Sequence, residues 1–197
     1  MPTELIPVAQ SWEKCVKKAN IHGTDAPEVD HEDMPQVMEK YGEAIPQIRE
    51  IGIWFDAWVT GLKVVYQDDV TMPTPLEIEH FGNLGANGGR YKSITLKKGE
   101  YITKVKGKIG SWTDELKITT SRGKVLKAKN EFADDARERL GGADDDYYDP
   151  KLKGQSMVVG FNTHWHHHLV KTEVCWIDLW KVDQKQVEAM QPPEISD

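Results

Sequence analysis

The sequence has no apolar run of about eighteen residues, the least that a membrane-spanning helix needs. Its first residues, MPTELIPVAQSWEK, lack the basic start and apolar stretch of a secretory signal, so we expect none. Only two cysteines occur, Cys15 and Cys175, which do not make a disulfide framework or a zinc knuckle. We therefore expect a cytoplasmic protein in a reducing compartment.

The sequence also has no excess of positive charge, because it contains 25 basic and 32 acidic residues and its net charge is -7. Binding to a phosphate backbone needs a basic face, so nucleic acid is not an expected partner. The motifs of common enzymes are missing too: no P-loop, nucleophile elbow, dinucleotide-binding glycine pattern or HExxH occurs. We therefore predict no cofactor.

From residue 47 onward the chain alternates apolar and polar residues with a period of two. Such alternation is typical of strands that place one side on a core and the other in water. The alternating segments are 51–53, 62–66, 94–96, 101–105, 116–118, 157–161 and 170–180. Short strands at regular spacing, with glycine-rich turns between them, predict an all-β sandwich or closed architecture.

Three regions of the 197-residue chain depart from this pattern. Residues 1–46 are expected to form an extension with helical turns over 12–19, capped by Ser11, and over 32–41. Residues 129–153 are an acidic insertion, interpreted as a surface loop with solvated charges. Residues 183–197 are polar and are expected to form a disordered tail, which leaves one domain over 47–182.

The stretch FGNLGANGGRYKSITLKKGEYITKVKGKIG, residues 81–110, resembles the middle of jacalin-related lectin domains. The segments 48–54, 61–66, 116–124 and 157–170 resemble other strands of that family in the right order, so the resemblance covers about residues 45–182. It implies a β-prism, in which three antiparallel Greek-key sheets surround a pseudo-threefold axis. It also implies sugar binding at the apex, through a glycine-rich N-terminal loop and a Gly-x-x-x-Asp loop before the last strands.

This sequence departs from the family at both loops. HGTDAPEVDHEDMPQV, residues 22–37, stands where the glycine-rich loop is expected. In the final loop, alignment of Leu169 places Val170 at the position of the sugar-binding aspartate. A carboxylate accepts sugar hydroxyl protons in charge-assisted hydrogen bonds, and valine cannot. The resemblance therefore supports the fold of the family more strongly than it supports the family's sugar-binding site.

Three histidines, His164, His166 and His168, alternate with Trp165 and His167. If this segment is a strand, the three imidazoles share one face, and the spacing permits a zinc site with an open position. No nearby acid or cysteine completes such a site, so we do not predict a metal. A polar loop tip is one alternative. A ligand pocket is the other, with apolar area from the rings and a hydrogen bond or proton from histidine.

The tryptophans are interpreted in two groups. Trp112 is expected in a turn, whereas Trp54, Trp58, Trp176 and Trp180 are interpreted as core or sheet-face residues. The candidate ligand-binding residues are Asn87, Gly88, Gly89, Trp112, Asn162, Thr163, His164, Trp165, His166, His167 and His168.

Three functions stay open, and a jacalin-like protein that binds carbohydrate through apical loops ranks first. The second is a cofactor-free enzyme on the same scaffold, such as a natural-product cyclase, a pericyclase of the Diels–Alderase type or an isomerase. Its pocket for an apolar metabolite would use the N-terminal segment and His164, His166 and His168 as catalytic residues. The third is a structural or interaction domain. By analogy with β-prism proteins, a homodimer is a further expectation.

Overall fold

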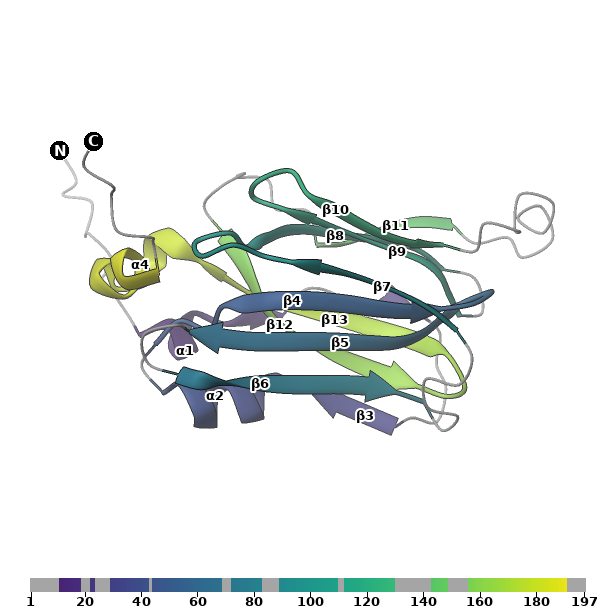
Figure 1. Ribbon diagram of the computed structural model, residues 1–197, viewed down its shortest axis with the longest axis horizontal. Helices are drawn as coiled ribbons and strands as arrows, with labels where there is room; N and C mark the ends of the chain where they lie inside the picture. Colours follow the sequence, from purple (N-terminus) through teal and green to yellow (C-terminus); the bar gives the residue numbers. More distant parts are fainter. Residues whose placement is uncertain are drawn as a thin grey trace, which may run out of the picture.

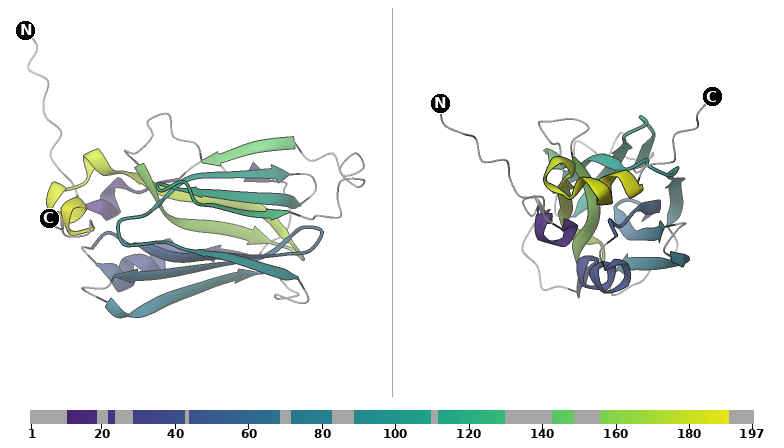
Figure 2. Two further views of the ribbon diagram at one scale, coloured as in Figure 1. Left: turned by 45° about the horizontal axis from the view of Figure 1, so that its top comes forward. Right: turned by 90° about the vertical axis from the view of Figure 1, so that its left-hand side faces the viewer.

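The computed structural model describes residues 11–18, 22–23, 29–42, 44–68, 72–82, 89–109, 112–129, 143–148 and 156–190. Within these ranges the chain forms three antiparallel sheets and a few short helices (Figure 1). The end-on view on the right of Figure 2 shows the three sheets around a common interior. None of the helices in the described part of the chain is long and apolar enough to cross a membrane.

Two of the sheets are built from consecutive strands with the same topology. The first contains β4 (Ile48–Phe55), β5 (Val59–Asp68), β6 (Met72–Phe81) and β7 (Arg90–Thr95), in the order β6-β5-β4-β7. The second contains β8 (Ile102–Ile109), β9 (Thr113–Thr120), β10 (Val125–Lys129) and β11 (Ala143–Tyr148), in the order β10-β9-β8-β11. In each the fourth strand returns beside the first, which is the Greek-key arrangement.

The third sheet joins the two ends of the chain. Its central hairpin is β12 (Ser156–Trp165) and β13 (Leu169–Asp178). Strand β3 (Val29–Glu32) pairs with β12, while β1 (Lys17–Lys18) and β2 (His22–Gly23) pair with β13. Three antiparallel sheets around one interior are the β-prism that the sequence predicts, so the predicted fold class is confirmed.

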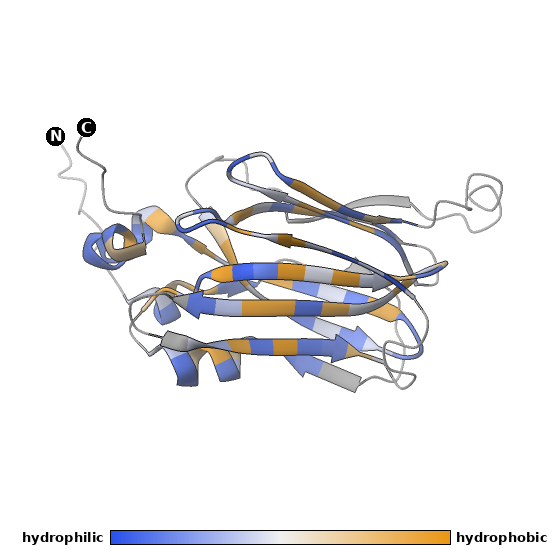
Figure 3. Cartoon of the chain, viewed as in Figure 1, coloured by the Kyte–Doolittle hydropathy of each residue, from blue (hydrophilic) through white to orange (hydrophobic). Residues whose placement is uncertain are grey.

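The alternating segments of the sequence supply the interior of the prism, as the banded strands of Figure 3 illustrate. In β4 and β5, for example, the paired residues Ile53 and Leu62 are fully buried, whereas the next pair, Trp54 and Gly61, faces outward. Together the three sheets bury one continuous apolar core. Its largest fully buried side chains include Trp12, Trp165, Tyr66, Phe55 and Phe161.

The N-terminal segment is an integral part of this fold, which corrects the expectation of an extension before residue 47. Besides its strands, it forms α1 (Trp12–Cys15), which lies on β13, and α2 (Met34–Tyr41), which lies on β12 and β6. Helix α2 agrees with the helical region expected over 32–41. Helix α1 covers only the start of the region expected over 12–19, because residues 17–18 form β1, and Ser11 makes no side-chain cap hydrogen bond. Strand β12 is buried at nearly every position, and α2 packs on it.

A single buried carboxylate links the N-terminal segment to two sheets through hydrogen bonds. Asp33, at the start of α2, is fully buried and accepts hydrogen bonds from the Tyr66 hydroxyl at 2.5 Å and the Phe161 backbone N–H at 2.9 Å. Its other oxygen lies 2.7 Å from Nε2 of His80. Gly160 permits the close approach of Asp33, because a Cβ at residue 160 would lie 3.0 Å from the Asp33 Cβ. One side chain thus bonds to β5, β6 and β12.

Two other sequence expectations need correction. Strand β11 lies inside the acidic insertion 129–153 and pairs with β8, so this part of the insertion is a sheet edge and not a loop. Residues 184–190 form α4 (Gln184–Met190) after a short 3₁₀ helix, η2 (Leu179–Lys181), and Val187 and Met190 are buried against the core. The predicted disordered tail therefore does not begin at residue 183; residues 191–197 lie outside the described residues.

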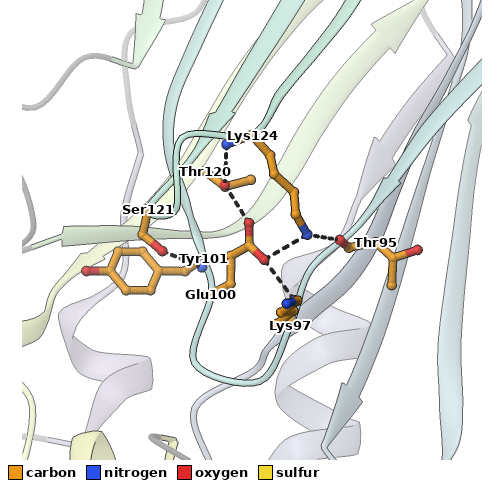
Figure 4. A network of polar contacts seen from close by, with 7 residues as sticks. All are labelled: Thr95, Lys97, Glu100, Tyr101, Thr120, Ser121 and Lys124. Atoms are coloured by element: carbon orange, nitrogen blue, oxygen red, sulfur yellow. Dashed lines mark hydrogen bonds and ion pairs between the residues drawn. The ribbon is translucent and has the colours of Figure 1, made fainter.

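A polar network closes one end of the second sheet (Figure 4). The buried Glu100 carboxylate accepts hydrogen bonds from the Thr120 hydroxyl at 2.6 Å, the Lys97 backbone N–H at 2.9 Å and Lys124 Nζ at 3.0 Å. Lys124 also donates to the Thr95 carbonyl at 2.7 Å. The network ties the loop between β7 and β8 to the turn between β9 and β10. Burial alone would raise the pKa of Glu100, but the three donors outweigh it and lower that pKa.

We predict that Glu100→Gln lowers the free energy of unfolding by about 1–3 kcal/mol at neutral pH, because Lys124 loses its buried charged partner. A carboxyl whose folded pKa is lowered stabilises the fold above the unfolded pKa, here about 4.5, and stops doing so as the pH falls through the folded pKa. Denaturant unfolding at about pH 7 and about pH 3 should therefore show a difference between the two proteins that shrinks in acid.

Glu39→Gln, on an exposed turn of α2, is the matched control and should change the unfolding free energy little at either pH. A Glu100→Gln difference that is equally large in acid would contradict the proposed role of the ionised carboxylate.

Candidate functional site

One end of the prism carries three hairpin turns of the same construction. The last pairs before the turns are Phe55 with Val59, Ile109 with Thr113, and Trp165 with Leu169. Each pairing leaves three residues in the turn. The described turn residues are 56–58, 112 and 166–168, one turn from each sheet. We call this end of the prism the apex; it lies at the right of Figure 1.

Each hairpin also carries a β-bulge at the same place. The pairing skips one residue between Trp54–Gly61 and Phe55–Val59, and does so again at the equivalent point of the other two hairpins. The skipped residues are Thr60, Asp114 and Val170. A bulge adds local twist and redirects side chains, and bulges are common beside functional sites. The three bulge residues are therefore equivalent under the pseudo-threefold symmetry of the prism.

The third residue of each turn brings a ring to the same point. The ring centroids of Trp58 and Trp112 are 4.8 Å apart, those of Trp58 and His168 are 4.8 Å apart, and those of Trp112 and His168 are 5.1 Å apart. We call these three residues the apical ring cluster. All three are partly exposed. Because the rings are in mutual contact, no ligand fits between them, and a ligand would lie on their outer faces.

His168 is held in an environment that disfavours its charged form. Burial lowers its pKa, the neighbouring Asp56 raises it in part, and His167 and His166 lower it further. Its Nδ1 atom is buried with no hydrogen-bond partner among the described residues. The ring therefore contacts the two tryptophans as a neutral imidazole near pH 7.

Two aspartates flank the cluster and differ in their surroundings. Asp56 is exposed, and its carboxylate accepts a hydrogen bond from the backbone N–H of Trp58 at 3.0 Å, so it caps its own turn. Asp114 is partly exposed. Burial raises the pKa of Asp114, and a side-chain hydrogen bond with Trp58 lowers it in part. This bond runs from the first turn to the second hairpin, so the Asp114 carboxylate lies beside the ring cluster.

The three histidines would share one face only if their segment were a strand throughout, and the structure does not meet this condition. Strand β12 ends at Trp165, and His166 and His168 lie in the turn, where the His166 backbone N–H donates to the His168 carbonyl at 3.2 Å. The rings of His166 and His167 contact each other, with centroids 4.1 Å apart, while His168 joins the apical ring cluster and His164 stays in β12. Among the described residues, no three His, Cys, Asp or Glu side chains converge as a metal site requires.

Three other predicted site residues are buried and serve the fold. Trp165 and Thr163 have no exposed surface, and Asn162 is 3% exposed. The Trp165 indole N–H donates to Thr163 Oγ1 at 2.7 Å, and Thr163 Oγ1 lies 2.7 Å from Nδ1 of His80, the partner of Asp33. This Asp–His–Thr chain superficially resembles a catalytic triad, but all its members are fully buried, so no substrate reaches it.

The segment that contains the predicted site residues 87–89 connects β6 to β7, and its described ends, Gly82 and Gly89, lie at the apex. A Cβ on Gly82 would lie 2.4 Å from the His166 carbonyl oxygen. A Cβ on Gly89 would lie 3.1 Å from both the Phe55 carbonyl oxygen and Thr60 Oγ1. These glycines let the backbone pack against the third and first hairpins. Asn87 and Gly88, also predicted as site residues, lie outside the described residues.

The sequence reading found Trp112 and the histidine turn but missed Trp58 and Asp114. The structure brings Trp112 and His168, which are far apart in the sequence, into contact. A signal for the missed pair was present in the sequence: DAWVT, GSWTD and HHHLV, residues 56–60, 110–114 and 166–170, occupy equivalent positions. The first two share tryptophan at the third position, and only the second ends in a carboxylate.

Comparisons with known proteins agree with this architecture. The family model of the jacalin-like lectin domain matches residues 30–170, more than half of the chain. The chain therefore belongs to the jacalin-like lectin domain family. No curated protein sequence matches the chain.

Several solved lectin structures share the fold. Frutapin, a lectin from Artocarpus incisa, is 16% identical with a TM-score of 0.59, over 82% of this chain and 97% of that chain. A mannose-specific jacalin-related lectin from Morus nigra, solved with mannose, is 14% identical with a TM-score of 0.59, over 82% and 94%. Malaysian banana lectin is 14% identical with a TM-score of 0.59, over 83% and 99%. At such identities the likeness shows the fold alone.

We predict that His168 titrates below pH 6.5, because its ring is held neutral by burial against Trp58 and Trp112. The neutral ring stabilises the apex above the unfolded pKa, and this contribution disappears as the pH falls through the lowered folded pKa. Two-dimensional NMR of the imidazole carbons over a pH series measures the midpoint, and His168→Gln assigns the signal. A midpoint at or above 6.5 would show that the ring is not packed as described.

Proposed function

We propose that this protein binds carbohydrate at the apex, with the apical ring cluster as the surface on which a sugar stacks. The observation that carries the proposal is the meeting of Trp58, Trp112 and His168 at the prism tip, each partly exposed. The C–H face of a pyranose is apolar, and an indole ring offers a large flat surface for it. Several jacalin-related lectins of the same fold are described as mannose-binding, which supports a neutral hexose as ligand.

A second aromatic group on the outer face of the first sheet offers a contrast. Trp54 packs between Tyr91 and Phe81, with ring centroids 4.4 Å and 4.9 Å away. Gly61 and Gly52 leave space for these rings. A Cβ at Gly61 would overlap Phe81, and a Cβ at Gly52 would overlap Tyr91. Here the rings pack on the outer face of the sheet and on one another, whereas the three turns meet in the apical ring cluster, so we assign binding to that cluster. No observation on the described residues favours the enzymatic alternative.

The test is a glycan array followed by titration calorimetry with the best neutral saccharide. Trp112→Ala should weaken binding roughly tenfold or more, because truncation of a central aromatic contact typically costs over 1 kcal/mol. Trp54→Ala removes an aromatic ring of the same size from the outer group and should leave the affinity within about twofold. The proposal is wrong if the array gives no hit at concentrations where weak lectins score, or if Trp54→Ala is the variant that loses binding.

A further inference from the structure

The outer face of the second sheet collects lysines from three adjacent strands, β8, β9 and β10. The residues that flank each lysine within its strand are mostly buried in the core, so the lysines point outward. All are partly exposed. We call this surface the lysine face; its members are Lys104, Lys106, Lys108, Lys117, Lys127 and Lys129. Strand pairing brings together lysines that form two separate runs in the sequence.

We propose that the lysine face docks the protein on an anionic lipid surface. Strands β8, β9 and β10 run along the side of the prism, whereas the apical ring cluster lies at its end (Figure 1). Contact between the lysine face and a membrane therefore leaves the apex open. Docking of this kind is independent of the proposed sugar binding.

The pairing register sets lysine opposite lysine. Lys117 of β9 pairs with Lys106 of β8 on one side and with Lys127 of β10 on the other, so three like charges form a row across the sheet. Neighbouring strands lie about 4.8 Å apart, and like charges directly opposite each other destabilise a sheet. An anionic partner on the outer face removes this repulsion. The row is therefore better suited to binding anions than to stabilising the fold.

Few carboxylates in the described part of the chain oppose these charges. Glu115 lies on the same face, with Oε1 2.8 Å from Lys127 Nζ, and is only 6% exposed. At the edge of the sheet, Asp144 of β11 pairs with β8. The lysines of β8 have polar contacts within the chain, whereas Lys117 and Lys129 form no ion pair with any described residue. These two lysines can direct their full charge to a partner.

The distribution of the lysines favours a planar partner over a linear one. They occupy three neighbouring strands, and along a strand they stand at alternate positions about 6.8 Å apart. Proteins that bind single-stranded nucleic acid use a basic groove with aromatic rings on which bases stack. None of the residues of β8, β9 and β10 is aromatic. An anionic membrane presents its charges over an area and needs no stacking surface.

The negative net charge of the whole protein does not prevent this contact. The net charge is -7, but charges farther from the membrane than the Debye length, about 8 Å at physiological ionic strength, are largely screened. The lysine face is the surface within that distance when the second sheet faces the membrane. Each lysine near an anionic surface strengthens binding by about fivefold, so several together give measurable affinity.

The experiment is cosedimentation of the full chain with lipid vesicles. Vesicles of phosphatidylcholine mixed with phosphatidylserine should bind the protein, vesicles of phosphatidylcholine alone should not, and added salt should weaken the binding. The double variant Lys117→Gln/Lys129→Gln should lose about tenfold or more in affinity for the anionic vesicles. Lys40→Gln/Lys185→Gln removes the same charge from exposed positions of α2 and α4 and should stay within about twofold.

Thermal melting separates lost binding from lost folding. Because Lys117 stands opposite two other lysines, its replacement by glutamine should leave the melting temperature unchanged or raise it. A clear fall in the melting temperature would contradict the view that the lysine row serves binding at the expense of stability.

The outcomes are distinct. A loss confined to Lys117→Gln/Lys129→Gln, with both double variants folded, supports docking through the lysine face. Failure of the unmodified protein to bind anionic vesicles at low salt overturns it, and so does an equal loss in both double variants. Retention on heparin or duplex DNA at a salt concentration that releases the protein from vesicles also overturns it, because the partner would then be a linear polyanion. Sugar binding at the apex is tested separately by the glycan array.

Discussion

Contact among three aromatic rings at one end of the prism links the fold of this protein to its site. Trp58, Trp112 and His168 come from turns far apart in the sequence, and they meet only because the three sheets close around a common interior. Closure buries the apolar face of every sheet, which is the dominant favourable contribution to folding. The hairpin ends then have fixed positions, and the third side chain of each turn lies in the apical ring cluster. The apical surface is thus a consequence of core packing.

The N-terminal segment takes part in this arrangement although its own strands are short. Asp33 connects it to β5, β6 and β12, and through His80 and Thr163 the buried polar chain reaches Trp165. Trp165 pairs with Leu169 at the base of the third turn, immediately before the histidines. A fully buried polar network is stable only if its members are satisfied by one another, so it specifies a single geometry. The position of the third hairpin therefore depends on residues more than a hundred positions earlier in the chain.

The sequence predicts the fold well for a clear physical reason. Period-two alternation is a local property, and it marks β4, β5, β8, β9, β12 and β13, whose apolar residues fill the core. The strands that were missed, β1, β2, β3, β6, β10 and β11, are edge strands of two to ten residues, where pairing is imposed by a neighbour. Helix α4 was missed because only Val187 and Met190 anchor an otherwise polar stretch.

The site was predicted less well, because its residues come from separate hairpins that only the symmetry of the folded prism brings together. Trp112 and the histidine turn stood out by composition, but Trp58 looked like a sheet residue and Asp114 had no evident partner in the sequence. Their significance depends on register: a skipped residue in each hairpin makes Asp114 the counterpart of Val170. Equally, Asn162, Thr163 and Trp165 were chosen for proximity to the histidines, and strand alternation together with the covering segments buries them.

The most direct test of the apical site is a nitrogen-15 NMR titration of the seven tryptophan indoles with a neutral saccharide. We expect the signals of Trp58 and Trp112 to move together as saccharide is added. The signals of the buried Trp12 and Trp165, and of Trp54 on the outer face of the first sheet, should stay in place. Saturable movement of the Trp54 signal with unmoved Trp58 and Trp112 signals would contradict an apical site.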